Sequence, residues 1–327
     1  MKKLMYLIIV IGVLALVVAG CGTSVNPVVP SLEQNKAAKG AVWHVPGDFV
    51  TIQLAIDSAD VETGDTIMVG PGEHAGAIVT KAVEIMGEDG AVINSGPDFY
   101  SWMAGFLFND DSGSGAIISH LQFEIVKFPI FSGGANDITV EHCTLLNPIQ
   151  GISNWMGSRW QISHNEIIDL CTADGGGIGI FIGDYMAIPE GVNDNLVSHN
   201  KITGTLFVDV GDGGGYNGTG IVLYADFRRD AEGAVGIENN RIVHNKISLI
   251  SDTPVVVDVV AIELTDSIND ANPVIVDNAI GFNDLRGTEL QIVLTPDNLD
   301  ECNDISRNLG DNRGHGLHPA AFGPGGN

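Results

Sequence analysis

Positive charge is scarce in this chain of 327 residues, which has 15 Lys and Arg against 41 Asp and Glu. The formal net charge of −26 disfavours nucleic acid and anionic membrane surfaces as partners, because both repel an acidic protein. The same acidity suits divalent cations and neutral or cation-bridged substrates. Alternatively, it only keeps a large β surface in solution.

Cysteine is also rare, and its spacing excludes some kinds of site. Cys143, Cys171 and Cys302 follow a first cysteine, Cys21, and no two of them are close enough in sequence to form a zinc knuckle. Cys143 falls inside a repeated strand motif, so packing is its expected role. The sequence has no Gly-x-Ser-x-Gly elbow, no phosphate-binding loop and no His-Glu-x-x-His motif, which disfavours several classes of hydrolase and nucleotide-binding protein.

One long apolar run is present, at the N-terminus. It extends from Leu4 to Val18, follows Lys2 and Lys3, and ends in small residues before Cys21. This segment resembles a bacterial lipoprotein signal, which implies cleavage before Cys21 and lipid modification of that residue. The alternatives are an ordinary signal peptide and a membrane anchor. Loss of the two lysines would leave 13 basic against 41 acidic residues, a net charge of −28.

The lipoprotein resemblance implies an extracytoplasmic protein, at the cell surface or the periplasmic face, that contacts the membrane only through its lipid. We therefore divide the chain into a signal peptide (1–21), a flexible tether (22–41), a main domain (42–312) and a Gly- and Pro-rich tail (313–327). We expect a monomer.

A short motif recurs six times and predicts the architecture. The six copies occupy 118–123, 140–145, 162–167, 197–202, 242–247 and 275–280. In the first three, His120, His142 and His164 are 22 residues apart in succession. A fixed period in this range is typical of a solenoid, in which each repeat forms one layer and neighbouring layers bury each other. We expect the His residues to stack at a strand end, in preference to forming a metal site.

The motif also predicts a bend. Its two apolar ends, such as Ile162 and Ile167, are five residues apart, so strict strand alternation would place them on opposite faces. A residue in the left-handed conformation between them would bring both into one core, and Asn tolerates that conformation. Four copies share an Asn slot in which side chains would hydrogen-bond along the stack: Asn165, Asn200, Asn245 and Asn278. Leu121 and Cys143 depart from this rule.

The N-terminal part of the main domain carries a family resemblance. Ile52, Ala55, Ile56 and Ala59 have helical spacing and follow Thr51, a good N-cap, so we expect a short helix that covers the end of the solenoid. The segment VPGDFVTIQLAIDSADVETGDTIMVGPGEHAGAIVTKAVEIMGE, with the later ISHNEI, VSHNKI and VHNKI units, resembles the pectin-lyase-like superfamily over about residues 42 to 312.

This resemblance implies an all-β fold, a single-stranded right-handed parallel β-helix. From the length of one layer we expect about 9–11 coils and a short N-terminal capping helix. The superfamily includes polysaccharide lyases, glycoside hydrolases, pectin methylesterases, a copper-insertion accessory protein and adhesins, so the resemblance is specific for fold and weak for function. The methylesterase signature is absent, and Gly314-His315-Gly316 lacks the other parts of the polygalacturonase set.

A second row of apolar strands follows the repeated motif, and several of these strands end in Asp. Asp184, Asp226 and Asp266 are such ends, and Glu263 lies within one of the strands. Two loops that carry the string Asp-Gly-Gly-Gly, at 174–177 and 212–215, precede the second strand and would wall a groove, since solenoid insertions mark the binding face. Each Asp can also be a simple turn former.

The acidic groove gives the candidate site. Stacked carboxylates repel one another, and a cation, a raised pKa or solvent must relieve the repulsion, so Asp184, Asp226 and Asp266 are candidate Ca²⁺ ligands. Paired carboxylates also serve as acid and base in glycosidic cleavage. The candidate catalytic residues are Asp184, Asp226, Glu263 and Arg228, where Arg228 is substrate anchor or base. The candidate substrate-binding residues are Asp174, Asp212, Tyr216 and Tyr224.

Three functions are compatible with these features. The first is binding or processing of an extracellular polysaccharide along the acidic groove, by lyase or hydrolase chemistry if it is catalytic. The second is a non-catalytic, structural or adhesive solenoid at the cell surface. The third is a periplasmic accessory protein for metal delivery.

Overall fold

The computed structural model describes the β-helix in detail. It describes residues 40–173, 177–184, 191–208, 218–225, 236–252, 258–266, 274–295, 299–310 and 313–315. Met1–Lys36 forms a separate unit from Ala37–Asn327 and lies outside the described residues, as does the predicted lipidation site Cys21. In the part of the chain that is described, no helix is both long and apolar enough to cross a bilayer.

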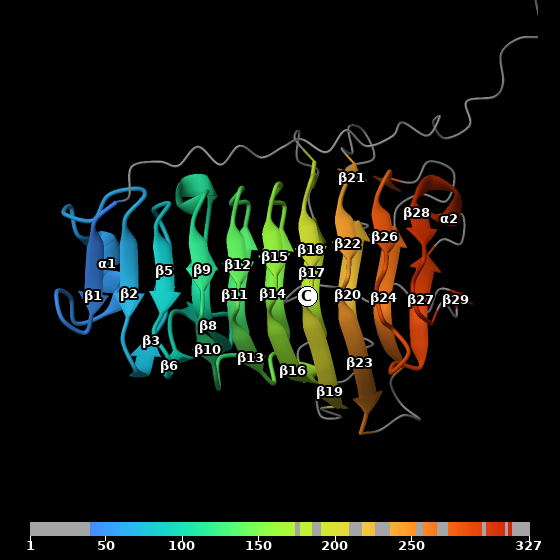
Figure 1. The fold of residues 1–327 in the computed structure, drawn as a ribbon, viewed down its shortest axis with the longest axis horizontal. Helices are drawn as coiled ribbons and strands as arrows, with labels where there is room; N and C mark the ends of the chain where they lie inside the picture. The colour runs from blue at the N-terminus through green and yellow to red at the C-terminus, as the bar shows by residue number, and fades with distance from the viewer. Residues whose placement is uncertain are drawn as a thin grey trace, which may run out of the picture. The chain divides into compact units, whose positions relative to one another are not determined.

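Three parallel sheets run side by side through the stacked coils (Figure 1). Sheet A has ten strands: β1 (Val42–Val45), β2 (Thr66–Val69), β5 (Glu84–Gly87), β9 (Ile117–Ser119), β12 (Thr139–Glu141), β15 (Gln161–Ser163), β18 (Leu196–Ser198), β22 (Arg241–Val243), β26 (Ala279–Gly281) and β28 (Asp304–Ser306). Its ten strands agree with the nine to eleven coils that the sequence predicts.

Sheets B and C supply the other strands of the coils. Sheet B has seven strands: β3 (Gly72–Ala75), β6 (Ala91–Ser95), β10 (Gln122–Phe123), β13 (Thr144–Leu146), β16 (Glu166–Cys171), β19 (Lys201–Phe207) and β23 (Lys246–Ser251). Sheet C contains β4 (Ala77–Ile78), β8 (Trp102–Phe108), β11 (Phe128–Gly133), β14 (Gln150–Trp155), β17 (Ile178–Asp184), β20 (Gly218–Ala225), β24 (Val259–Asp266), β27 (Leu290–Thr295) and β29 (Arg313–His315).

The remaining elements are short. β7 (Asp98–Phe99) pairs with β8 in an antiparallel hairpin, and β21 (Ile237–Glu238) pairs with β25 (Ile275–Val276). The helical elements are α1 (Ile52–Asp57), the 3₁₀ turn η1 (Asp111–Gly113) and α2 (Leu299–Cys302). Where all three sheets are present, the chain passes from sheet A to sheet B to sheet C in every coil, which confirms the predicted parallel β-helix. The strand pairing continues to His315, inside the segment assigned to the tail.

The helix α1 forms where its sequence predicts it. The Thr51 hydroxyl accepts a hydrogen bond from the Leu54 N–H at 3.2 Å, as an N-cap does. Ile52, Ala55 and Ile56 are fully buried and belong to the same core cluster as the strands of sheet A. The apolar side of this helix therefore covers the core at the β1 end (Figure 1).

Apolar side chains inside the coils form vertical columns. In sheet A, Val140, Ile162 and Val197 are aligned by the strand register, and each is at most 1% exposed. Each fully buried Ile or Val contributes about 1.5–3 kcal/mol relative to an exposed one. The repeated motif therefore stabilises the stack by giving every coil an identical apolar position.

The bend between sheets A and B is present, but the residue that turns the chain is not the Asn that the sequence predicts. The residues with positive φ are the histidines, with φ of 54° to 60° at His120, His142, His164, His199 and His244. The Asn that follows each of the last three is buried. Leu121 and Cys143 are therefore not exceptions, since His120 and His142 make the bend in those coils and a buried residue follows each of them.

The buried Asn side chains form the predicted hydrogen-bonded ladder. Asn165 Nδ2 donates to Asn200 Oδ1 at 3.0 Å, Asn200 Nδ2 donates to Asn245 Oδ1 at 3.0 Å, and the backbone N–H of each Asn donates to the same oxygen. Asn283 and Asn308 continue this ladder. The assignment of Asn278 to it is wrong, because Asn283 holds that place.

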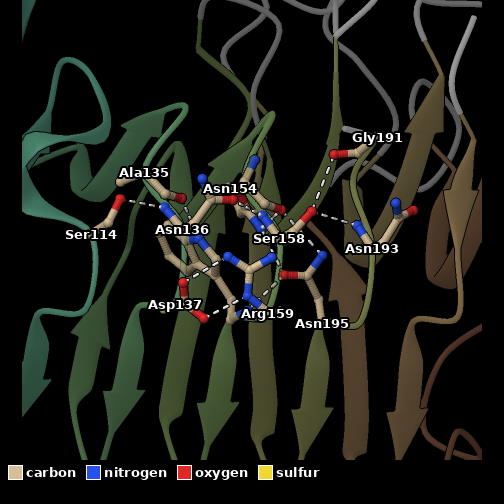
Figure 2. A network of polar contacts seen from close by, with 12 residues as sticks. Ser114, Ala135, Asn136, Asp137, Asn154, Ser158, Arg159, Gly191, Asn193 and Asn195 are labelled. Carbon is tan, nitrogen blue, oxygen red and sulfur yellow. Dashed lines mark hydrogen bonds and ion pairs between the residues drawn. The ribbon is translucent and has the colours of Figure 1, made fainter. Parts of the chain in front are cut away.

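Asn278 belongs to a second ladder at the bend between sheets C and A. This ladder joins Asn195, Asn240, Asn278 and Asn303 through Nδ2···Oδ1 distances of 2.8 to 2.9 Å. Figure 2 shows its beginning, where Asn154 Nδ2 donates to Asn195 Oδ1. The sixth repeat, 275–280, is therefore the approach to sheet A, one bend earlier than the motif predicts.

A charged pair marks the outside of this second bend. Asp137 and Arg159 have φ of 59° and 61° and lie one coil apart (Figure 2). Arg159 donates from Nε and Nη2 to the two oxygens of Asp137, both at 2.7 Å, and this contact raises the pKa of Arg159. Both side chains are about half exposed, so the pair adds at most about 1 kcal/mol to stability.

The histidines form the column that the repeat predicts. The imidazole rings of His120, His142, His164, His199 and His244 stack with centroids 5.0 to 5.1 Å apart. Phe282 extends the column, and the Arg307 guanidinium lies 5.2 Å from its ring centroid. Desolvation lowers the pKa of His199, and the charges of His164 and His244 on either side add to this effect.

We predict that Asn200→Ala destabilises the stack by at least about 2 kcal/mol, because it leaves the Asn165 N–H and the Ile162 carbonyl buried without their partner. Chemical denaturation would measure the change. Lys201→Ala is the matched control, since it removes only a half-exposed ion pair with Glu166. Equal stability of Asn200→Ala and the wild type would contradict a structural role for the ladder.

We also predict that the stability of the β-helix falls as the pH is lowered through about 6.5, the ordinary pKa of histidine. The lowered pKa of His199 means that the unfolded chain binds this proton more tightly, so acid favours unfolding. Thermal melts between about pH 7.5 and about pH 5.5 would measure this effect. His199→Asn should flatten the dependence, whereas His44→Gln, outside the column, should not.

Candidate functional site

The outer face of sheet C is where the sequence predicts a groove, and a column of glycines shapes this face. A Cβ on Gly151 would contact the core side chains Ile167 and Leu145, and the next residue, Ile152, also faces the core. A Cβ on Gly179 would lie 2.5 Å from the Gly220 carbonyl oxygen, so a larger residue does not fit. The glycine and the isoleucine after it both face the core, so the strand bends at this point. The side chains that point away from the core form the outer face.

The strand register fixes the order of side chains on this face. One row consists of Ser153, Phe181, Val222, Glu263 and Val293. A second row, two residues further along each strand, consists of Trp155, Gly183, Tyr224, Thr265 and Thr295. Both rows thus bring together residues that are far apart in the sequence.

Aromatic rings line the middle of this face. Trp155 stacks on Phe181 with centroids 4.0 Å apart, and Phe181 lies 5.9 Å from Tyr224. Phe131, one coil earlier, is 6.5 Å from Trp155. Trp155, Phe181 and Tyr224 are each at most 2% exposed, so they pack as a second apolar cluster outside the main core.

Glu263 lies at the end of the aromatic cluster. Its side chain is 2% exposed, and two threonine hydroxyls hold it. Thr219 Oγ1 donates to Oε2 at 3.0 Å, and Thr265 Oγ1 donates to Oε1 at 2.6 Å. Thr219 comes from β20 and Thr265 from the same strand as Glu263, so the sheet register orients the carboxylate. A buried carboxylate fixed by hydroxyl groups can exchange a proton with a ligand bound against it.

Two residues of the predicted acidic row lie in described strands of sheet C. The register aligns Asp184 with Ala225 and Ala225 with Asp266, so the two aspartates are two coils apart, about 10 Å by strand spacing. Asp266 is 2% exposed, and its Oδ2 accepts a hydrogen bond from the Val274 N–H at 2.7 Å. This contact occupies one oxygen of the Asp266 carboxylate.

The other predicted site residues are placed as follows. Tyr224 is fully buried in the aromatic cluster. Asp174, Asp212, Tyr216, Asp226 and Arg228 lie outside the described residues. Within the described ranges, no group of three or more His, Cys, Asp and Glu side chains is arranged to hold a metal ion.

Thr219, Thr265, Trp155 and Phe181 were not expected at the site. Their positions depend on the offset between strands, which a single sequence does not give where connections vary in length. Cys143, by contrast, packs as predicted, since it is 1% exposed and burial raises its pKa to about 12.

No family model matches the sequence, and no curated protein is similar to it. Among solved structures, the chain is similar to the catalytic domain of a GH87 alpha-1,3-glucanase in complex with tetrasaccharides, with a TM-score of 0.31 and 13% sequence identity, over 91% of this chain and 70% of that one. The fold of this chain is established by its own strand pairing.

Calcium binding by Asp184, Asp226 and Asp266 stays a prediction. If these carboxylates bind Ca²⁺, millimolar Ca²⁺ should raise the melting temperature, because a ligand that binds only the folded state stabilises it. Mg²⁺ is the control for ionic strength. A melting temperature that does not respond to Ca²⁺ would remove this site from consideration.

Proposed function

We propose that the protein binds polysaccharide along the outer face of sheet C and cleaves it with Glu263 as the acid or base. The position of the Glu263 carboxylate carries this proposal. It lies in the outer row beside Val222, one coil from Tyr224 and two coils from Phe181, and Thr219 and Thr265 hold both of its oxygens. Flat aromatic side chains next to a fixed polar group are typical of ligand sites.

Glycosidic cleavage needs a proton donor at the leaving oxygen and usually a second carboxylate. Glu263 would supply or remove the proton. The register aligns Asp184 and Asp266 with Ala225, which belongs to the main core, so Glu263 is the carboxylate that the described outer face contributes. If the substrate contains uronate, removal of a proton from the sugar ring followed by loss of the leaving group gives an unsaturated product instead.

A non-catalytic solenoid is the second candidate, and one observation favours it. Phe181 and Tyr224 are 0% exposed and Glu263 is 2% exposed, so in this structure the outer face of sheet C packs like a core. In that case, Glu263 and its two threonines are a buried hydrogen-bonded cluster that serves stability.

A panel of soluble polysaccharides would separate the two candidates, with new reducing ends and ultraviolet absorbance of unsaturated uronates as readouts. We predict that the wild type forms product and that Glu263→Gln loses about 10²–10⁴-fold in rate while its melting temperature changes little. Glu166→Gln, on sheet B, is the matched control and should remain active. A wild type inactive on every polysaccharide, or an active Glu263→Gln, would favour the non-catalytic solenoid.

A further inference from the structure

A hairpin beside sheet C forms a pocket that the proposed site does not include. The hairpin joins β7 and β8, with Phe99 opposite Trp102, and its pocket has a volume of about 500 Å³. The lining residues are Asp98, Tyr100, Ser101, Trp102, Met103, Ile125 and Lys127. This volume is within the range of small-ligand sites.

Ile125 is an unexpected residue for its place in the fold. It has φ of 68°, and the Val126 N–H donates to the Glu124 carbonyl at 2.7 Å across it, which forms a tight turn that is rare and strained. A β-branched residue with positive φ is an outlier. Its side chain is nevertheless 64% exposed, so burial does not compensate for the strain.

The following coils show which residues suit this corner. When the sheet B register is continued past the ends of the strands, Ile125 corresponds to Asn147 and Asn147 to Asp169, and these two residues have φ of 48° and 60°. In the next coil, Gly204 lies at this corner beside Asp169 and has φ of 113°. Asn, Asp and Gly are the residues that tolerate the left-handed region. Folding alone would therefore favour one of them over Ile125.

Tyr100 repeats the same conflict at the tip of the hairpin. It has φ of 53°, in a turn where Gly or Asn is preferred, and it is 67% exposed. Two bulky apolar residues thus hold unfavourable backbone conformations, face solvent and line one pocket. Strain of this kind concentrates at functional sites.

The pocket combines this apolar surface with polar groups of both signs. Asp98 offers a carboxylate, Ser101 a hydroxyl and Lys127 an ammonium group that donates to the Asn147 carbonyl at 2.8 Å. An ammonium has three hydrogens, so Lys127 can donate further. A pyranose ring has one apolar face and a rim of hydroxyls that both donate and accept. The opposite charges of Asp98 and Lys127 favour a neutral sugar over an acidic one.

The hairpin is also continuous with the aromatic face of sheet C. Phe99 lies 4.7 Å from Tyr100 and 4.2 Å from Phe131 between ring centroids. Phe131 leads in turn to Trp155. The pocket therefore adjoins the row of aromatic side chains that leads towards Glu263.

We infer that the hairpin pocket is a binding subsite for a neutral sugar ring, whose apolar face packs on Tyr100 and Ile125. Asp98, Ser101 and Lys127 hydrogen-bond to its hydroxyls. The inference rests on the proposed function, because it takes the same class of substrate and adds a second point of contact some coils before Glu263.

Calorimetric titration of the full chain with cellohexaose, xylohexaose and mannohexaose tests this subsite. The wild type should bind at least one of them. Ile125→Asn and Tyr100→Asn should each weaken binding at least about tenfold, with a melting temperature equal to or above that of the wild type, because Asn suits both backbone conformations. Phe207→Ala removes an exposed aromatic side chain from sheet B and should bind as the wild type does.

Unchanged affinity in Ile125→Asn and Tyr100→Asn, or no binding of any probe by the wild type, would overturn the subsite. A lower melting temperature in Ile125→Asn would overturn the argument from strain. Glu263→Gln separates this inference from the proposed function. If the wild type forms product but Ile125→Asn binds sugar equally well, the subsite is wrong and the proposed function stands. If Ile125→Asn weakens binding but the wild type forms no product, the subsite stands and the catalytic proposal is wrong.

Discussion

The buried Asn amides are the constraint on which this β-helix depends. Each amide accepts the backbone N–H and the Nδ2–H of the Asn one coil before it, and donates its own Nδ2–H to the next. An Asn placed one residue out of line would leave several buried polar groups without partners, at a cost of about 1–3 kcal/mol for each. The ladders at two bends therefore fix the alignment of neighbouring coils, and every other column inherits it.

The candidate site is a product of this alignment. Thr219 and Glu263 are 44 residues apart in the sequence, yet their side chains are hydrogen-bonded because β20 and β24 pair in register. The glycine column at Gly151, Gly179 and Gly220 then bends sheet C in the same place in successive coils. Because the backbone repeats, the chemistry of the outer face depends only on which side chain each coil contributes, from Trp155 through Phe181 and Tyr224 to Glu263.

The sequence predicts the fold well because its signals are local. The repeated motif, the 22-residue period and the stacked histidines all follow from short segments. The bending residue was misassigned because His and Asn stand next to each other in the motif, and both can adopt positive φ. Asn278 was misplaced because the two bends use the same device. Paired asparagines five residues apart, such as Asn195 with Asn200 and Asn240 with Asn245, distinguish the bends.

The site was less predictable for a different reason. Pairing across sheet C depends on where each strand begins, and the connections between coils vary in length, so the alignment of Asp184 with Ala225 could not be read from the chain. The pairing of Glu263 with two threonines and the strain at Ile125 were unpredictable for the same reason. Both require knowing which residues of separate coils are neighbours.

Successive rungs of the first ladder are 35, 45, 38 and 25 residues apart, although their backbone N–H to Oδ1 distances stay between 2.8 and 3.0 Å. Extra chain is therefore absorbed between the bends without a change in the stack. During evolution, such a molecule can gain or lose whole segments by insertion and deletion while its scaffold is unchanged. New recognition elements can thus arise without passing through a misfolded intermediate.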